Sequence, residues 1–384
     1  MAMDEDTFEQ VIGAIRRFVR EVMIPAEARV EEEDRIPPEI LAGMKNIGLF
    51  GLTIPEEYGG FGMSMSEEAA VLFEIGQAAP AFRSAFATTV GIASQGIVLD
   101  GTPEQKQRYL PRLATGEIIG AFALTEPDAG SDAASIRTSA RREGEAYLIN
   151  GTKRFITNAP EAGVFTVFAR TGTTDARANG ISAFLVEAGT PGLSLGGPDR
   201  KMGHHGSHTC DVIFENCRVP ASALLGGKEG VGFKTAMKAL DRGRLHIAAA
   251  SVGVAERLIG DALRYALDRR QFGKPIADFE LVQAMLADCR TESYAGRCMV
   301  EDAARRRDAG EPVAGLASCC KYFCTEMVGR VADRAVQIHG GSGYMKDFRV
   351  EQFYRDVRLY RLYEGTSQIQ QLIIARDMIR SARA

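Results

Sequence analysis

The stretch IGAFALTEPDAGSD, residues 119–132, marks the point at which the pattern of this 384-residue chain changes. Before it, apolar residues recur every three or four positions, as they do in amphipathic helices. After it come short apolar or alternating runs separated by turn residues, as in strands. Long helical patterns return at Gly232. This order predicts an α+β multidomain fold in which a β domain stands between two helical domains.

Residues 1–118 predict an N-terminal helical domain. One helix of this domain is expected after Thr102, because this residue is a good N-cap and Pro103 follows it at the first helical position. The first helix is indicated by apolar residues at helical spacing: Phe8, Ile12, Ile15, Val19 and Val22.

Residues 119–228 predict a compact middle β domain, and the glycine-rich segment 226–230 is its expected linker to the next domain. Asn150-Gly151 separates two apolar runs of the middle domain. Both residues of this dipeptide tolerate the positive φ angles of a tight turn, so we expect a β-hairpin there.

Residues 229–384 predict a C-terminal four-helix bundle, because their helical patterns are long and have few interruptions. The interruptions lie near residues 272–275, 310–312 and 340–343.

Composition excludes several classes of protein. With 45% hydrophobic and 25% charged residues, the chain is neither disordered nor collagen-like. Its longest largely apolar stretch, residues 245–255, is much shorter than the roughly 20 residues of a membrane span. The acidic N-terminus lacks the pattern of a signal peptide. Seven cysteines without a CxxC pair favour free thiols and a cytoplasmic location.

The charge distribution disfavours a nucleic-acid partner. Residues 229–384 hold 25 Lys and Arg against 20 Asp and Glu, whereas residues 1–228 hold 21 against 30. The small positive excess of the C-terminal part is a thin basis for binding nucleic acid.

General motif searches find little. The chain has no GxGxxG after a strand, no GxxxxGK[ST] and no GxSxG elbow. Imidazole and thiol groups of His204, His205, His208 and Cys210 could bind zinc. They stand within a few residues of one another, however, and no second cluster completes a cage. We therefore expect a polar loop there and no metal site.

Two segments are far more specific: LTEPDAGSD at residues 124–132, after an expected strand, and YEGTSQIQ at residues 363–370, opening the last helix. In this order they resemble the acyl-CoA dehydrogenase family, flavoenzymes that form a double bond between Cα and Cβ of an acyl-CoA. The resemblance covers nearly the whole chain and implies the acyl-CoA dehydrogenase fold with an FAD cofactor. Further matching segments are residues 151–158, 201–203, 269–273 and 337–341.

The resemblance assigns a cofactor site. Residues implied to line the flavin or the adjacent acyl-CoA are Phe122, Leu124, Thr125, Ser131, Phe155 and Thr157. Residues implied to reach the cofactor from elsewhere are Arg269, Phe272, Gln337, Gly340, Gly341, Thr366 and Gln368. In the family, the arginine and the 337–341 loop come from a neighbouring subunit, which implies a homotetramer. From the residues alone, other interpretations remain. The Thr and Ser hydroxyls could merely hydrogen-bond the backbone of a turn. Arg269 could be an ordinary charged residue at a helix end, and Gly340-Gly341 could simply end a helix.

By the same resemblance, Glu364 is the catalytic base that takes the α-proton. Some family members carry this base at the position of Gly243, which cannot take a proton here. Without the resemblance, Glu364 could simply precede a helix capped by Thr366 or Ser367. Asp241 and Arg244 match positions near the CoA moiety, although a salt bridge is the rival account. Tyr363 and Gly365 complete the implied substrate contacts.

Arg83 resembles an arginine that pairs with the distal carboxylate in family members acting on glutaryl-CoA. This resemblance implies a short- or medium-chain acyl-CoA with an anionic far end, against the alternative of an ordinary surface or ion-paired arginine. Electrons are expected to pass to an electron-transfer flavoprotein. The rival functions are a decarboxylating or desulfinating enzyme of the same fold and a DNA-binding flavin relative. His205 stands where the family's loop usually carries arginine.

Overall fold

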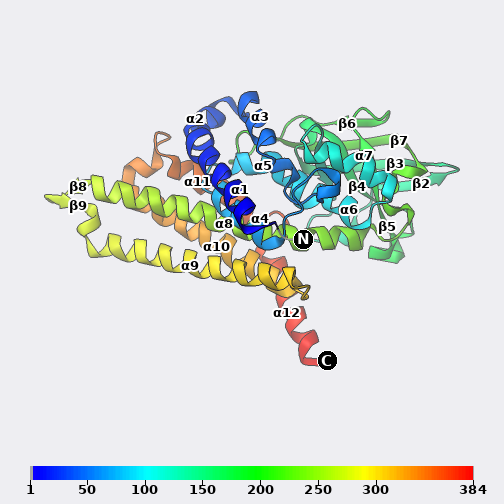
Figure 1. Ribbon diagram of the computed structural model, residues 1–384. Coiled ribbons are helices and arrows are strands. Elements are labelled where there is room, and N and C mark those ends of the chain that lie inside the picture. The colour runs from blue at the N-terminus through cyan, green and yellow to red at the C-terminus, as the bar shows by residue number, and fades with distance from the viewer. Residues whose placement is uncertain (1–2, 384) are drawn as a thin grey trace.

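The computed structural model of this chain describes residues 3–383 (Figure 1). Helices form its N-terminal part. Thr102 caps the last of them: its hydroxyl accepts a hydrogen bond from the Gln105 backbone N–H at 3.3 Å, and the Gln105 side chain accepts one from the Thr102 N–H at 3.1 Å. The cap expected at Thr102 is confirmed. The helices are α1 (Glu5–Phe18), α2 (Ile24–Glu33), α3 (Pro38–Asn46), α4 (Met65–Ile75), α5 (Pro80–Thr88), α6 (Ser94–Asp100) and α7 (Pro103–Ala114).

A twisted sheet follows within residues 119–220. Its strands are β1 (Ile119–Ala123), β2 (Ser139–Glu143), β3 (Ala146–Thr157), β4 (Ala162–Arg170), β5 (Ile181–Glu187), β6 (Leu193–Leu195) and β7 (Thr209–Pro220). Strand β4 pairs with β1 in parallel and with β5 in the antiparallel sense, while β3 pairs antiparallel with β2 and β7. The apolar sides of these strands, including Phe165, Phe184 and Phe214, form a separate buried core.

The hairpin predicted at Asn150-Gly151 is wrong. Both residues lie inside the continuous strand β3, where the pairing with β7 shifts register between Ile149 and Gly151. Gly151 has a φ of 145°, and a Cβ there would overlap Thr138. The glycine therefore serves a β-bulge and a close approach of two backbones. The tight connection stands earlier, between β2 and β3 at Gly144, whose φ is 61°.

The C-terminal part is again helical, so the predicted order of helices, sheet and helices is confirmed. The helices α8, α9 and α10 run side by side in Figure 1, and residues of all three meet in one apolar core. The elements are α8 (Gly232–Asp268), β8 (Arg270–Gln271), β9 (Lys274–Pro275), α9 (Glu280–Asp308), α10 (Ala314–His339), α11 (Arg349–Val357) and α12 (Ser367–Arg383).

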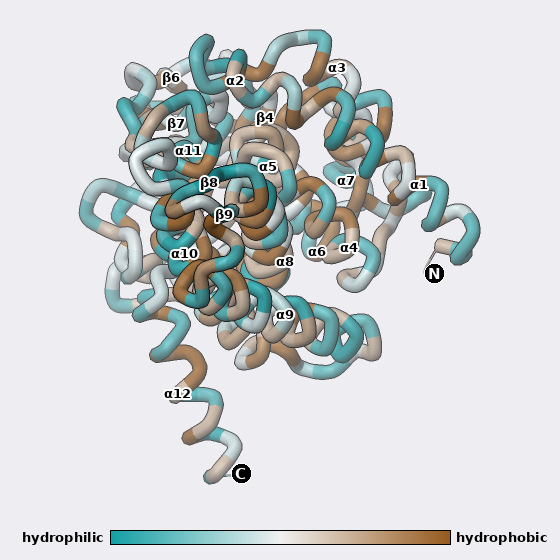
Figure 2. Tube along the Cα trace, turned by 90° about the vertical axis from the view of Figure 1, so that its left-hand side faces the viewer, coloured by the Kyte–Doolittle hydropathy of each residue, from teal (hydrophilic) through white to brown (hydrophobic). Residues whose placement is uncertain are grey.

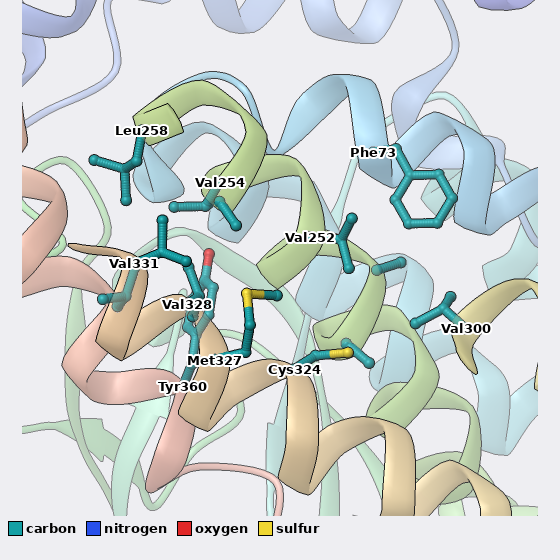
Figure 3. Packing of buried hydrophobic residues seen from close by; sticks show 14 of the residues in the cluster. Phe73, Val252, Val254, Leu258, Val300, Cys324, Met327, Val328, Val331 and Tyr360 are labelled. Carbon is teal, nitrogen blue, oxygen red and sulfur yellow. The ribbon is translucent and has the colours of Figure 1, made fainter. Parts of the chain in front are cut away.

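The bundle core joins the two helical parts. Figure 3 shows Val252 and Val254 of α8 facing Met327 and Val328 of α10, with Phe73 of α4 at the same core. Burying such side chains stabilises the fold by about 1.5–3 kcal/mol each. Helix α12 instead projects from the bundle in both views (Figures 1 and 2) and leaves apolar side chains exposed: Leu372, Met378 and Ile379.

Candidate active site

A cavity of about 480 Å³ lies where the two helical parts meet the sheet. The end of β1, the end of β3, the first half of α8 and the segment before α12 all contribute to its wall. Many of the residues that the sequence singled out come together here: Arg83, Phe122, Leu124, Thr125, Ser131, Phe155, Thr157, Arg244, Tyr363, Glu364 and Gly365.

Glu364 stands in the short segment that leads into α12. Its φ is 52° and that of Gly365 is 90°, so two consecutive residues adopt the left-handed conformation. For a non-glycine residue this conformation costs about 1–3 kcal/mol and persists where the surroundings enforce it. The carboxylate oxygen Oε2 is buried and has no hydrogen-bond partner among residues 3–383. The backbone thus presents an unpaired carboxylate to the cavity.

The surroundings of Glu364 set its electrostatics. Burial raises the pKa of the Glu364 carboxyl above its ordinary value, while the cations Arg83, Lys321 and Arg244 pull that pKa back. Each cation donates a hydrogen bond to a different acceptor: the Tyr363 hydroxyl at 3.0 Å, the Gly365 carbonyl at 2.7 Å and Asp241 at 2.5 Å, respectively. A raised pKa and a free oxygen are the properties that a general base needs.

Two further residues of the cavity wall share this backbone strain. Phe155 has a φ of 58° and His204 also has a φ of 58°. Non-glycine residues in this region are uncommon and gather at functional sites. Their coincidence with Glu364 on one cavity identifies that cavity as the candidate active site.

The end of β3 suits a flat aromatic group. The Phe155 ring is 58% exposed although it lines the cavity, and hydroxyls of Thr125, Ser131 and Thr157 stand on the same wall. An apolar face with hydroxyls around it can pack an isoalloxazine ring and hydrogen-bond its polar edge. The residues present therefore fit a flavin.

The remaining predicted residues lie outside this cavity. Thr366 accepts a hydrogen bond from the Ile369 N–H at 3.3 Å, and Gln368 is exposed on α12. Asp241 forms a salt bridge with Arg244 within α8, as the alternative interpretation of this pair expected. Arg244 also lines the cavity. The β8–β9 end of the bundle lies far from the sheet (Figure 1). Five predicted residues are exposed at or near this end: Arg269, Phe272, Gln337, Gly340 and Gly341. One chain alone does not bring them to the cavity.

Three cavity or near-cavity residues were missed by the sequence reasoning. Ser84 and His204 line the cavity beside Arg83, with 3.4 Å between the Ser84 hydroxyl and His204 Nδ1. Lys321 is fully buried on α10 and donates a hydrogen bond to the Gly365 carbonyl, next to Glu364. A lysine on the otherwise apolar face of a long helix was the signal that could have found it.

The histidines of the 201–209 loop have separate partners. His204 Nε2 lies 3.0 Å from the Asp356 carbonyl, His205 Nδ1 lies 2.8 Å from Glu31, and His208 Nδ1 lies 2.7 Å from Glu161. Within residues 3–383, no group of three or more His, Cys, Asp and Glu side chains is arranged to hold a metal ion.

Comparisons with known proteins agree with this architecture. Family models of the acyl-CoA dehydrogenase N-terminal, middle and C-terminal domains match residues 5–117, 121–217 and 230–379. The chain is 44% identical over 367 residues to acryloyl-CoA reductase (NADH) of Anaerotignum propionicum, covering 95% of this chain and 92% of that protein. It is 40% identical over 346 residues to subunit CarC of the caffeyl-CoA reductase-Etf complex of Acetobacterium woodii, covering 90% and 91%.

A solved structure also matches nearly the whole chain. Butyryl-CoA dehydrogenase from Megasphaera elsdenii matches with a TM-score of 0.94 and 33% identity, covering 99% of this chain and 100% of that one. The chain therefore belongs to the acyl-CoA dehydrogenase family. Its members are oxidoreductases that act on the CH–CH group of acyl-CoA, and the family implies a flavin cofactor. None of the helices within residues 3–383 combines the length and apolar character of a membrane span.

Proposed function

We propose that this protein is an FAD-dependent acyl-CoA dehydrogenase in which Glu364 removes the α-proton of the substrate. The observation that carries the proposal is the buried, unpaired oxygen Oε2 of Glu364, a residue of the cavity wall. The α-hydrogen of a thioester is a very weak acid, so its base must be desolvated and its pKa raised. When bound, FAD supplies the acceptor for the β-hydride.

The chain's own residues orient the reactants in this proposal. The hydroxyls of Thr125, Ser131 and Thr157 hold the flavin edge, and the exposed Phe155 ring packs against the flavin. As the α-proton leaves, negative charge develops on the thioester oxygen and needs hydrogen-bond donors. The Glu364 backbone N–H is our candidate for one of them. Arg244 is buried on the cavity wall, where it suits the CoA moiety.

We further propose that Arg83 selects an acyl group with an anionic far end. The Arg83 side chain is only 5% exposed, its Nε has no hydrogen-bond partner, and it forms no ion pair with any Asp or Glu of residues 3–383. A buried cation that forms no direct ion pair is costly, and a carboxylate or similar anion of the substrate would offset that cost. Because Arg83 contacts Tyr363 next to the base, a short acyl chain is favoured.

Assembly completes the proposed cofactor site. Phe272 is 92% exposed at the tip between β8 and β9, and Arg269 is exposed beside it. An exposed aromatic tip of this kind suits insertion into a neighbouring subunit. We therefore propose a homotetramer in which these residues reach a neighbour's FAD, together with Gln337, Gly340 and Gly341. An electron-transfer flavoprotein is the proposed acceptor, which the Etf complex of the relative supports.

The names of two relatives support a second direction of the same chemistry, the reduction of an enoyl-CoA. A base that removes the α-proton in one direction returns it in the other. Decarboxylation after oxidation is a further variant that an anionic acyl chain would allow.

Anaerobic spectroscopy tests the proposal. The flavin absorbance of the purified protein should bleach when saturated acyl-CoAs such as butyryl-CoA or glutaryl-CoA are added, with formation of the enoyl-CoA. If the chemically reduced protein is instead reoxidised by enoyl-CoAs and no saturated thioester bleaches it, the reductive direction is the function. If neither occurs with any thioester of the panel, the proposed function is wrong.

A further inference from the structure

Helix α10 carries a lysine that is buried among apolar side chains. Lys321 is 0% exposed, and Ala317, Cys320 and Cys324 of the same helix are buried around it. Removing an ammonium group from water is costly unless it gains partners. Among residues 3–383, the hydrogen bond that its Nζ donates is to the Gly365 carbonyl at 2.7 Å. No carboxylate of these residues lies within ion-pair distance of it.

Lys321 contacts the strained turn in which Glu364 and Gly365 both have positive φ angles. The Gly365 carbonyl also accepts from Gln370 Nε2 at 3.0 Å, and the same amide lies 3.3 Å from the Glu364 carbonyl. Farther along α10, Glu326 accepts hydrogen bonds from Ser367 at 2.6 Å and from Arg361 at 3.0 Å. Helix α10 thus fastens the segment on both sides of Glu364, and Lys321 holds its centre.

The charge of Lys321 also reaches the base. Charged groups that act on the Glu364 carboxylate come from four helices: Glu68 of α4, Arg83 of α5, Arg244 of α8 and Lys321 of α10. Lys321 in turn faces Glu364, Arg244 and Glu326. Burial lowers the pKa of Lys321 to about 8, and the Glu364 carboxylate opposes that shift. At neutral pH the ammonium is therefore largely charged.

We propose that Lys321 is a positioning residue for the reaction: its ammonium holds the Gly365 carbonyl and so fixes the left-handed turn that presents the Glu364 carboxylate to the cavity. The inference rests on the proposed role of Glu364. Lys321 itself does not line the cavity. Without it, the turn loses its central hydrogen bond, and Glu364 loses one of three nearby cations.

The test compares Lys321→Met with Thr325→Val in the full-length flavoprotein. Methionine keeps the length and apolar character of the lysine stem but removes the donor and the charge. Thr325 lies one turn further on the same helix and is fully buried. Its hydroxyl donates a hydrogen bond to the Lys321 backbone carbonyl at 2.8 Å, so Thr325→Val removes a bond to Lys321 and leaves the lysine ammonium in place. Lys321→Arg, which keeps a cationic donor, serves as a second variant. Hydrogen exchange over residues 360–370 and anaerobic flavin bleaching by butyryl-CoA or glutaryl-CoA are measured.

In Lys321→Met, residues 360–370 should exchange faster, and the bleaching rate at saturating thioester should fall by about 10–100-fold. The thioester concentration for half-saturation should change much less. The rise of the bleaching rate with pH should also occur at a higher pH than in the wild type, because loss of a cation raises the pKa of Glu364. Thr325→Val should keep the wild-type exchange and pH profile, and Lys321→Arg should recover part of the rate.

Equal exchange, rate and pH profile in Lys321→Met and Thr325→Val would overturn the inference. If Lys321→Met does not fold, Lys321→Gln replaces it, because glutamine keeps a neutral donor. The inference is then overturned if Lys321→Gln shows the pH profile, the exchange rate and the bleaching rate of the wild type. The proposed function fails separately: it fails if Glu364→Gln bleaches as fast as the wild type, whatever the lysine variants do.

Discussion

The carboxylate of Glu364 fills the space that a side chain at position 243 would need. A Cβ built on Gly243 would overlap Glu364 Oε2, although 121 positions separate the two residues in the sequence. The first half of α8 therefore forms the floor on which the Glu364 carboxylate lies. Only glycine leaves enough room there.

Gly243→Ala should accordingly push the carboxylate out of its place. We expect the anaerobic bleaching rate to fall by about 10–100-fold, since a displacement of one atom's width at a reacting group costs this much. Gly260→Ala on the same helix is the matched control, because no atom lies within 4 Å of its new methyl group. That control should bleach at the wild-type rate. Equal rates in both variants would show that the space above Gly243 does not matter.

Asp356 gives a prediction for stability. Burial raises the pKa of this carboxyl from 3.8 to about 7, although it accepts a hydrogen bond from the His204 N–H. A group whose pKa is raised in the folded state contributes its stability fully below the unfolded pKa, and the contribution is lost as pH rises through the folded value. The contribution of Asp356 to the free energy of unfolding should therefore fall between about pH 4 and pH 7.

The comparison with Asp356→Asn isolates this group. Relative to the variant, the wild type should lose up to a few kcal/mol over that interval, measured by urea unfolding at each pH. A constant difference between the two proteins across the interval would mean that Asp356 is already ionised in the folded state at low pH.

Arg83 should decide the preference for the acyl group. Arg83→Met removes the charge and keeps much of the volume, so the preference for glutaryl-CoA over butyryl-CoA should fall by about 10–1,000-fold in kcat/KM. Arg112→Met is the control, because the Arg112 side chain is 43% exposed and pairs with Glu117 away from the cavity. An unchanged preference in Arg83→Met would end the idea of an anionic acyl chain, even if both variants remain active.

Arg269 should matter for the cofactor and not for folding. In Arg269→Ala we expect the flavin content per chain to fall severalfold, because a guanidinium that forks onto the pyrophosphate is lost. Arg264 of the same helix is also exposed and pairs with Asp261, so Arg264→Ala should keep its flavin. The absorbance ratio of flavin to protein after gel filtration measures both. Full flavin content in Arg269→Ala would contradict the proposed arrangement of subunits.

The sequence predicted the order of the domains because helical and strand periodicities are local properties of the chain. It failed at Asn150-Gly151, where the same dipeptide that favours a turn serves a bulge inside β3. Local propensity could not reveal that Thr138, just before β2, packs against the Gly151 backbone. The role of Lys321 was hidden for a similar reason, since its partner Gly365 lies 44 positions away.

The proposed role of Glu364 as the base could be predicted from the sequence only through a family resemblance. Fifty acidic residues compete for the role of base, and no periodicity separates them. What distinguishes Glu364 is its left-handed backbone, its burial and its free oxygen, all of which arise from long-range packing.

The most direct test of the account is the anaerobic bleaching rate of Glu364→Gln. The amide keeps the shape of the carboxylate but cannot accept the α-proton, so the variant should bind flavin and thioester normally. Its flavin should be reduced at least about 1,000-fold more slowly than that of the wild type. Bleaching at a rate close to the wild-type value, with the thioester that works best on the wild type, would show that another group is the base.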